Sequence, residues 1–139
     1  MASTFRSDAA AALLGLLTTY QTANPTLLRK VTRTRPSSVG ETPAAWIGDL
    51  SESIRHTGNI RQRTFTIPIV IVDVLADSDE TADRMDDLVD ALIDVFTAAP
   101  HAVSGATLVE PTGVTEQEID GPFHGVAIAV SGLIQEGRS

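Results

Sequence analysis

Between Ile60 and Ala99 the apolar positions first alternate along the chain and then recur at helical spacing. Residues 64–74 are mostly β-branched or aromatic, and apolar side chains fall on both faces of an extended strand. One face carries Phe65, Ile67, Ile69 and Ile71, and the other carries Val70, Val72 and Val74. This pattern predicts a strand inside a sheet, or one whose second face is covered by a neighbour. Pro68 cannot donate to a ladder, so it predicts an edge position or a bulge at that point.

A helix is predicted to follow, with Ser78 or Asp79 as its cap and Pro100 beyond its end. Its apolar stripe consists of Ala82, Met85, Leu88, Val89, Leu92, Ile93 and Phe96. The opposite face is acidic and consists of Asp83, Asp86, Asp87, Asp90 and Asp94. Two interpretations of that face stay open. It is either a solvated, solubilising surface or an acidic wall facing something that must not adhere, such as DNA.

The N-terminal half predicts one further helix and several strands. The helix spans residues 7–22, with Ser7 as cap, Asp8 in its first turn and a buried stripe around Leu13 and Leu17. Residues 27–35 predict a basic strand near a sheet edge, since Lys and Arg discourage aggregation there. After a loop over 36–43, residues 44–49 predict a short strand in which Trp46 is structural.

A hairpin and two C-terminal strands complete the predicted sheet. Thr57-Gly58-Asn59 separates two extended runs and predicts a hairpin turn. Residues 106–111 predict a short strand, and residues 112–121 predict an acidic loop. Residues 123–134 predict a last strand that pairs centrally with residues 60–74.

Length and composition limit the classes of protein. With 139 residues, 42% apolar and 20% charged, the chain predicts one globular domain, residues 1–139. It contains no Cys, which excludes disulfides and thiolate chemistry. No apolar run approaches the roughly 20 residues that span a membrane, so no membrane partner is expected.

Charge divides unevenly between the two halves of the chain. Residues 1–70 carry eight Lys and Arg against four acids, whereas residues 71–139 carry two against fourteen. The net charge of −8 repels phosphate, which argues against general nucleic-acid binding. The asymmetry instead suits a head-to-tail contact between copies, which closes into a ring or opens into a filament.

Motifs for catalysis or cofactor binding are not found in the sequence. It has no Gly-rich phosphate loop, no nucleophile elbow and no pair of His at helical spacing. Residues 77–80 are explained by helix capping rather than by cation binding. We therefore expect no enzyme activity, no cofactor and no metal site.

The order of motifs resembles a known family. An N-terminal helix ending near Pro25 precedes a basic strand, the segment 43–49 (PAAWIGD) and the segment 55–58 (RHTG). The strand 63–74, the helix segment 84–92 (RMDDLVDAL) and a last strand closing at 135–138 (QEGR) follow. This arrangement resembles the tail terminator (tail completion or minor tail) proteins of long-tailed bacteriophages, especially those of actinobacteriophages, over nearly the whole chain.

The resemblance implies an α+β fold, with two main helices on one face of a mixed or antiparallel β-sheet and a projecting β-hairpin. It implies a virion protein at the tail–neck junction, assembled in the host cytoplasm. There a homohexameric ring caps the tube of the major tail tube protein and joins it to the head-tail stopper of the neck, with DNA passing through the lumen. It implies no catalytic residues.

Two surfaces are hypothesised to carry these contacts. A basic surface is expected at the contact between protomers and consists of Arg29, Arg33, Arg35, Arg55, Arg61 and Arg63. An acidic surface is expected to face the lumen or a partner and consists of Asp83, Asp87, Asp90, Asp94, Glu116, Glu118 and Asp120. Two alternatives stay open: another neck component, such as a stopper or adaptor, and a small cytoplasmic α+β ligand-binding domain or enzyme.

Overall fold

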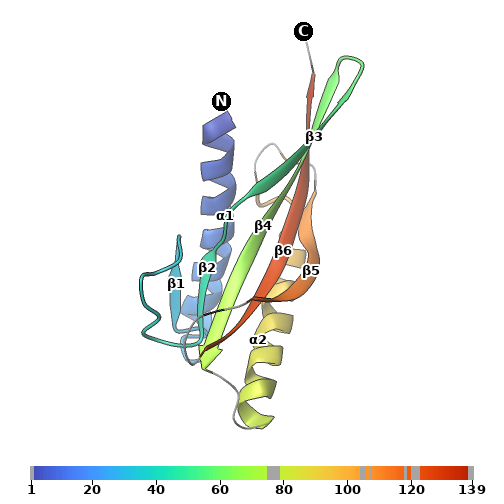
Figure 1. Cartoon of the computed structure of the whole chain (residues 1–139). Coiled ribbons are helices and arrows are strands. Elements are labelled where there is room, and N and C mark those ends of the chain that lie inside the picture. The colour runs from blue at the N-terminus through green and yellow to red at the C-terminus, as the bar shows by residue number, and fades with distance from the viewer. Residues whose placement is uncertain are drawn as a thin grey trace.

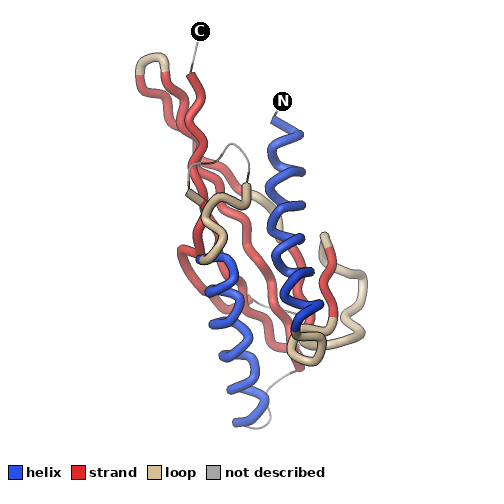
Figure 2. The backbone as a smooth tube through the Cα atoms, turned by 180° about the vertical axis from the view of Figure 1, so that it is seen from behind, coloured by secondary structure: helices blue, strands red, loops and turns tan. Residues whose placement is uncertain are grey.

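The computed structural model describes residues 2–74, 79–103, 106, 108–117, 119 and 123–137. Two helices cover one face of a six-stranded mixed sheet (Figures 1 and 2), which confirms the predicted α+β class. The elements are α1 (Ala2–Ala23), β1 (Lys30–Thr32), β2 (Ala44–Ile47), β3 (Ser51–Thr57), β4 (Ile60–Val74), α2 (Asp79–Thr97), β5 (Val109–Gln117) and β6 (Phe123–Gly137). Neither described helix combines the length and apolar character needed to cross a bilayer.

The sheet order is β1-β2-β4-β6-β5, and β3 pairs with the first half of β4. Among the strands that the structure describes, only the β1–β2 pair is parallel. β4 is central, with β2 and β3 along one side and β6 along the other over all its 15 residues. The prediction that the last strand pairs centrally with residues 60–74 is therefore confirmed.

The main core lies between the helices and the face of β4 that carries Phe65, Ile67, Ile69 and Ile71, each at most 1% exposed. The predicted stripes of both helices contribute to it. Leu13 and Leu17 come from α1, and the α2 residues are Met85, Leu88, Val89, Leu92 and Phe96. The 3.6-residue period was sufficient to identify the buried side of α2, because the described part of this helix packs one side against the sheet.

The other face of β4 has a smaller cluster of its own. Trp46, Val70 and Val72 are buried there under Val39, Ile119 and Phe123. A neighbouring strand and loop residues therefore cover the second face, as its apolar pattern predicted. Trp46, 3% exposed, is structural as predicted.

Pro68 lies in the central strand, so the predicted edge position was wrong, and β4 itself pairs with β6 in regular register there. β2 ends opposite Ile69 and β3 begins opposite Thr66, so Gly48–Leu50 interrupts the pairing across from Pro68. The Gly48 amide donates to the Pro68 carbonyl at 2.7 Å, which shows that the backbone polar groups of Pro68 point toward this interruption. The missing N–H of Pro68 therefore removes nothing from the β4–β6 ladder.

Three predicted boundaries were wrong. α1 starts at Ala2, so Ser7 lies inside the helix and is not its cap. β1 covers only Lys30–Thr32 of the strand predicted over 27–35. β5 runs to Gln117, so most of the predicted acidic loop is a strand, because pairing with β6 supplies hydrogen bonds that composition does not reveal. The predicted cap at Ser78 lies outside the described residues.

Candidate interaction surfaces

A three-stranded arm projects from one end of the molecule (Figure 1). It consists of β3, residues 60–66 of β4 and the end of β6. Its tip is the predicted two-residue turn, in which Gly58 has a φ of 58°, a conformation that favours glycine. The arm carries three of the predicted basic residues, Arg55, Arg61 and Arg63.

Arg63 is held inside the arm. Its Nη2 donates to both carboxylate oxygens of Glu52 at 2.8 Å, and the two side chains are 11% and 7% exposed. A pair so poorly exposed fixes β3 to β4 at the base of the arm. Arg55, in contrast, is exposed.

The remaining predicted basic residues lie elsewhere. Arg29, Arg33 and Arg35 are exposed around β1, at the opposite edge of the sheet from β5. The views in Figures 1 and 2 separate β1 clearly from the arm. The structure therefore divides the predicted basic surface into two regions, one on the arm and one around β1.

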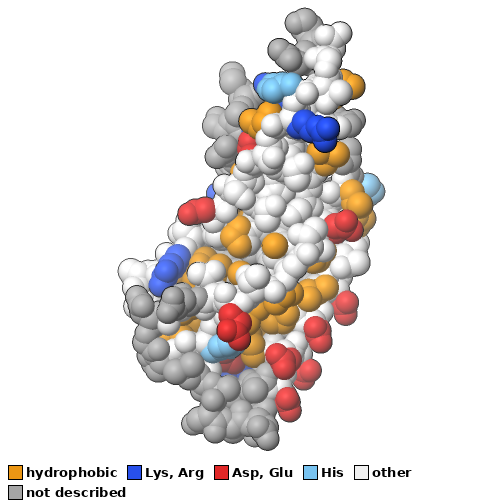
Figure 3. All heavy atoms as spheres, turned by 45° about the vertical axis from the view of Figure 1, so that its right-hand side comes forward, with side chains coloured by type: hydrophobic (Ala, Val, Ile, Leu, Met, Phe, Trp, Pro, Cys, Tyr) orange, Lys and Arg blue, Asp and Glu red, His pale blue; other side chains and the backbone are white. Residues whose placement is uncertain are grey.

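The predicted acidic residues on α2 form a single exposed row. Asp83, Asp87, Asp90 and Asp94 are all exposed. Figure 3 shows acidic side chains gathered along one edge of the molecule, over α2. Glu116 is exposed on β5, and its pairing with Val126 places it on the side of the sheet that the helices cover. Glu118 and Asp120 lie outside the described residues.

One ion pair was missed by the sequence analysis. Asp73, 1% exposed at the end of β4, accepts hydrogen bonds from Nε and Nη2 of Arg84, both at 2.9 Å, and from the Val74 amide at 2.8 Å. Arg84 is the only cation in α2. The sequence did contain a signal for this pair. Arg84 is an isolated cation, and it follows a carboxylate at the end of an apolar strand, Asp73, by eleven residues.

A groove of about 540 Å³ lies between the end of α1 and the first half of α2. Its walls are mainly apolar side chains from α1, the following loop and α2, with two carboxylates at the α2 side. The lining residues are Tyr20, Leu27, Asp83, Arg84, Asp87, Leu88 and Ala91. Burial raises the pKa of the Tyr20 hydroxyl above its usual value, which further favours the neutral form of this side chain in the groove.

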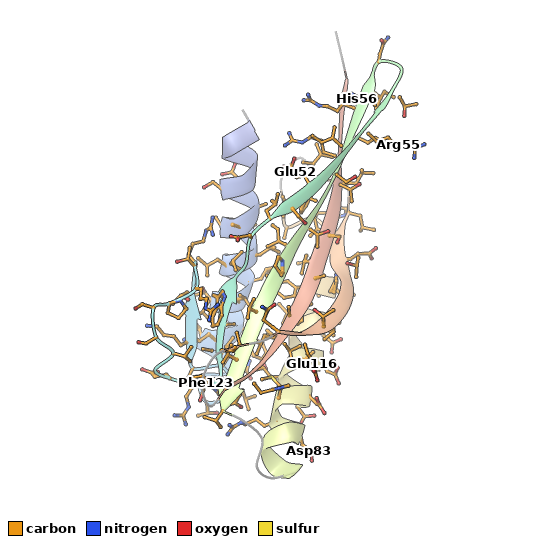
Figure 4. The ribbon with its side chains drawn as sticks, in the orientation of Figure 1. Glu52, Arg55, His56, Asp83, Glu116 and Phe123 are labelled. Atoms are coloured by element: carbon orange, nitrogen blue, oxygen red, sulfur yellow. The ribbon has the colours of Figure 1, made fainter. Side chains whose placement is uncertain are left out.

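No cluster of three or more potential metal ligands occurs among the residues that the structure describes. His56, at the tip of the arm, and Asp83, on α2, lie at opposite ends of the molecule (Figure 4).

No protein-family model and no curated protein matches the chain. The fold of the chain does match a solved structure. The chain is similar to a chain of the "Virion of native gene transfer agent (GTA) particle", with a TM-score of 0.66. The likeness covers 94% of this chain and 96% of that chain, at 10% sequence identity. At that identity the likeness shows a shared fold.

Proposed function

We propose that the chain is a structural virion protein of a long-tailed phage or phage-like particle, and that it acts as the tail terminator. In this role copies of the chain form a ring, six by the family resemblance, that caps the tail tube and contacts the neck. The observation that carries the proposal is the fold shared with a virion chain over nearly the full length of both chains.

Surface charge supports a ring of identical copies. Arg55 is exposed on the arm and further cations are exposed around β1, whereas exposed acids line α2 and reach β5. Opposite charges on separate surfaces favour a heterologous contact, in which one surface of each copy meets a different surface of the next. The acidic groups that such contacts leave uncovered are proposed to face the lumen. There they repel the DNA backbone over a Debye length of about 8–10 Å.

The test combines native mass spectrometry of the purified chain with electron microscopy of tail tubes to which the chain has been added. We expect a ring-sized oligomer and density at one end of the tube. Binding to the portal side in place of the tube would identify a stopper or adaptor. A monomer that binds neither structure, and that holds a small molecule in the groove, would contradict the virion role and support a ligand-binding domain.

A further inference from the structure

The outer face of the arm tip presents an apolar side chain beside a cation. Ile60 is 46% exposed and Arg55 is exposed. Thr57 pairs with Ile60 and Arg55 pairs with Gln62, so all four share the face of the sheet opposite the helices. Ile60 and Arg55 are diagonal neighbours on that face. The tip therefore presents a small surface that is partly apolar and partly positive.

The groove between α1 and α2 has the complementary character. Tyr20, Leu27, Leu88 and Ala91 provide apolar walls, and Leu27 is 44% exposed although it lies in this concave site. The volume of about 540 Å³ falls within the range of binding pockets, roughly 300–1,000 Å³. An apolar side chain entering the groove would remove its own surface and that of Leu27 from water.

The groove is acidic in spite of Arg84. The guanidinium of Arg84 is bound to the buried carboxylate of Asp73, so the charges of that pair largely cancel. Asp83 and Asp87, both exposed, remain to set the sign of the field at the groove. A cation such as Arg55 is attracted to this position.

The arm of a single chain does not reach its own groove. Figure 4 places Arg55 at one end of the molecule and Asp83 at the other. We propose that the arm tip of one copy docks in the α1–α2 groove of the next copy. In this contact Ile60 lies against the apolar walls and Arg55 lies between Asp83 and Asp87. The contact is heterologous, and it rests on the proposed ring because it supplies a contact between neighbours.

Cysteine crosslinking tests the contact directly, because the natural chain contains no Cys. One preparation carries Ile60→Cys, and a second, distinguishable by a mass tag, carries Ala91→Cys in the groove wall. Mixing them with a short bis-maleimide should yield a covalent dimer containing both chains. The matched control is Ile54→Cys. Ile54 has a similar exposure of 53%, but its pairing with Arg63 places it on the opposite face of the arm.

Equal crosslinking of the Ile54→Cys and Ile60→Cys variants to the Ala91→Cys variant, or none with either, would overturn the proposed contact. The second measurement is a charge exchange followed by analytical ultracentrifugation. Arg55→Glu and Asp87→Lys should each weaken self-association about five- to tenfold, and the double variant should recover most of the loss. Asp86→Lys is the matched control, since Asp86 is exposed on the same helix but does not line the groove.

Loss of association by Asp86→Lys as large as that by Asp87→Lys would show a general charge effect and would contradict the pairing. The pairing would also be contradicted if the double variant, Arg55→Glu with Asp87→Lys, associated no more tightly than the single variants. The proposed contact and the proposed function can fail independently of each other. A ring that caps tubes, but in which the arm-tip and groove cysteines do not crosslink, overturns the contact alone. The same crosslink in an oligomer that ignores tail tubes overturns the tail role alone.

Discussion

At the scale of single residues, close contacts between distant positions define the local structure. Gly48 is one example, because a Cβ at this position would lie 2.6 Å from Pro68 Cγ and 3.1 Å from the Pro68 carbonyl oxygen. The hydrogen bond from Gly48 to Pro68 requires this approach. A proline in a central strand is thus matched by a glycine in its interrupted neighbour.

Gly48→Ala is therefore expected to lower the free energy of unfolding by about 1–3 kcal/mol, because backbone or proline ring must shift to admit the methyl group. Urea denaturation measures the change. Gly40→Ala is the control, since a Cβ there meets nothing within 4 Å, and it should change stability by less than about 0.5 kcal/mol. Equal losses from both variants would contradict the close-contact explanation.

Arg84→Ala should destabilise the protein by about 1–3 kcal/mol, because the carboxylate of Asp73 stays buried and loses two hydrogen bonds. The lower part of that range is favoured, since the Arg84 side chain is 43% exposed and solvent screens the pair. Arg84→Lys keeps the charge without the bidentate geometry and should fall between the wild type and Arg84→Ala in the same denaturation measurement. A Lys variant less stable than the Ala variant would show that the charge has no stabilising role.

At the scale of elements, β4 joins a rigid body to a projecting arm. Residues 69–72 in its second half are buried on both faces and paired on both sides. Its first half is paired with β3 and β6, but β3 is exposed along almost its whole length. The Glu52–Arg63 pair joins β3 to the first half of β4. The two ends of one continuous strand therefore differ in how much packing protects them.

Hydrogen exchange should follow this division. Amides of residues 69–72 are expected to exchange only through global unfolding, whereas amides of residues 54–57 should exchange much faster through local opening. Glu52→Gln should accelerate exchange in the arm while leaving residues 69–72 unchanged, as measured by mass spectrometry of peptides. A uniform acceleration across β4 would mean that the pair stabilises the whole fold and not the base of the arm.

At the scale of the whole molecule, the arm and the α1–α2 groove lie at opposite ends, and the acidic row of α2 runs away from the groove toward β5. Asp83 and Asp87 border the groove, whereas Asp90 and Asp94 lie farther along the helix. The first pair is assigned to the contact between copies. The second pair, with Glu116, is assigned to the proposed lumen.

Replacing Asp90 and Asp94 together by Lys should then slow DNA passage through assembled particles while the mass of the ring stays unchanged. The effect should weaken with salt, as the Debye length falls from about 10 Å at 0.1 M to about 3 Å at 1 M. DNA release from particles at several ionic strengths measures it, with the double Asn variant as a neutral control that should be less affected. Normal DNA release by the Lys variant would show that Asp90 and Asp94 do not face the lumen.

The sequence by itself determined the elements whose signals are local. Period-two and period-3.6 patterns identified β4 and α2 with their buried faces, the sequence also predicted β6, and Gly58-Asn59 identified the hairpin. The start of α1 and the extent of β5 were not predicted correctly from the sequence. For β5 the reason is that a strand stabilised mainly by its neighbour carries little pattern of its own.

Only the tertiary structure decided which distant side chains meet. The Asp73–Arg84 and Glu52–Arg63 pairs depend on how a strand end meets a helix and how two strands are registered. The separation of the basic residues into two regions depends on the order of the strands in the sheet, and the groove lined by Leu27 depends on where α1 ends relative to α2. Packing between elements sets these relations, and a one-dimensional pattern of polar and apolar residues does not encode them uniquely.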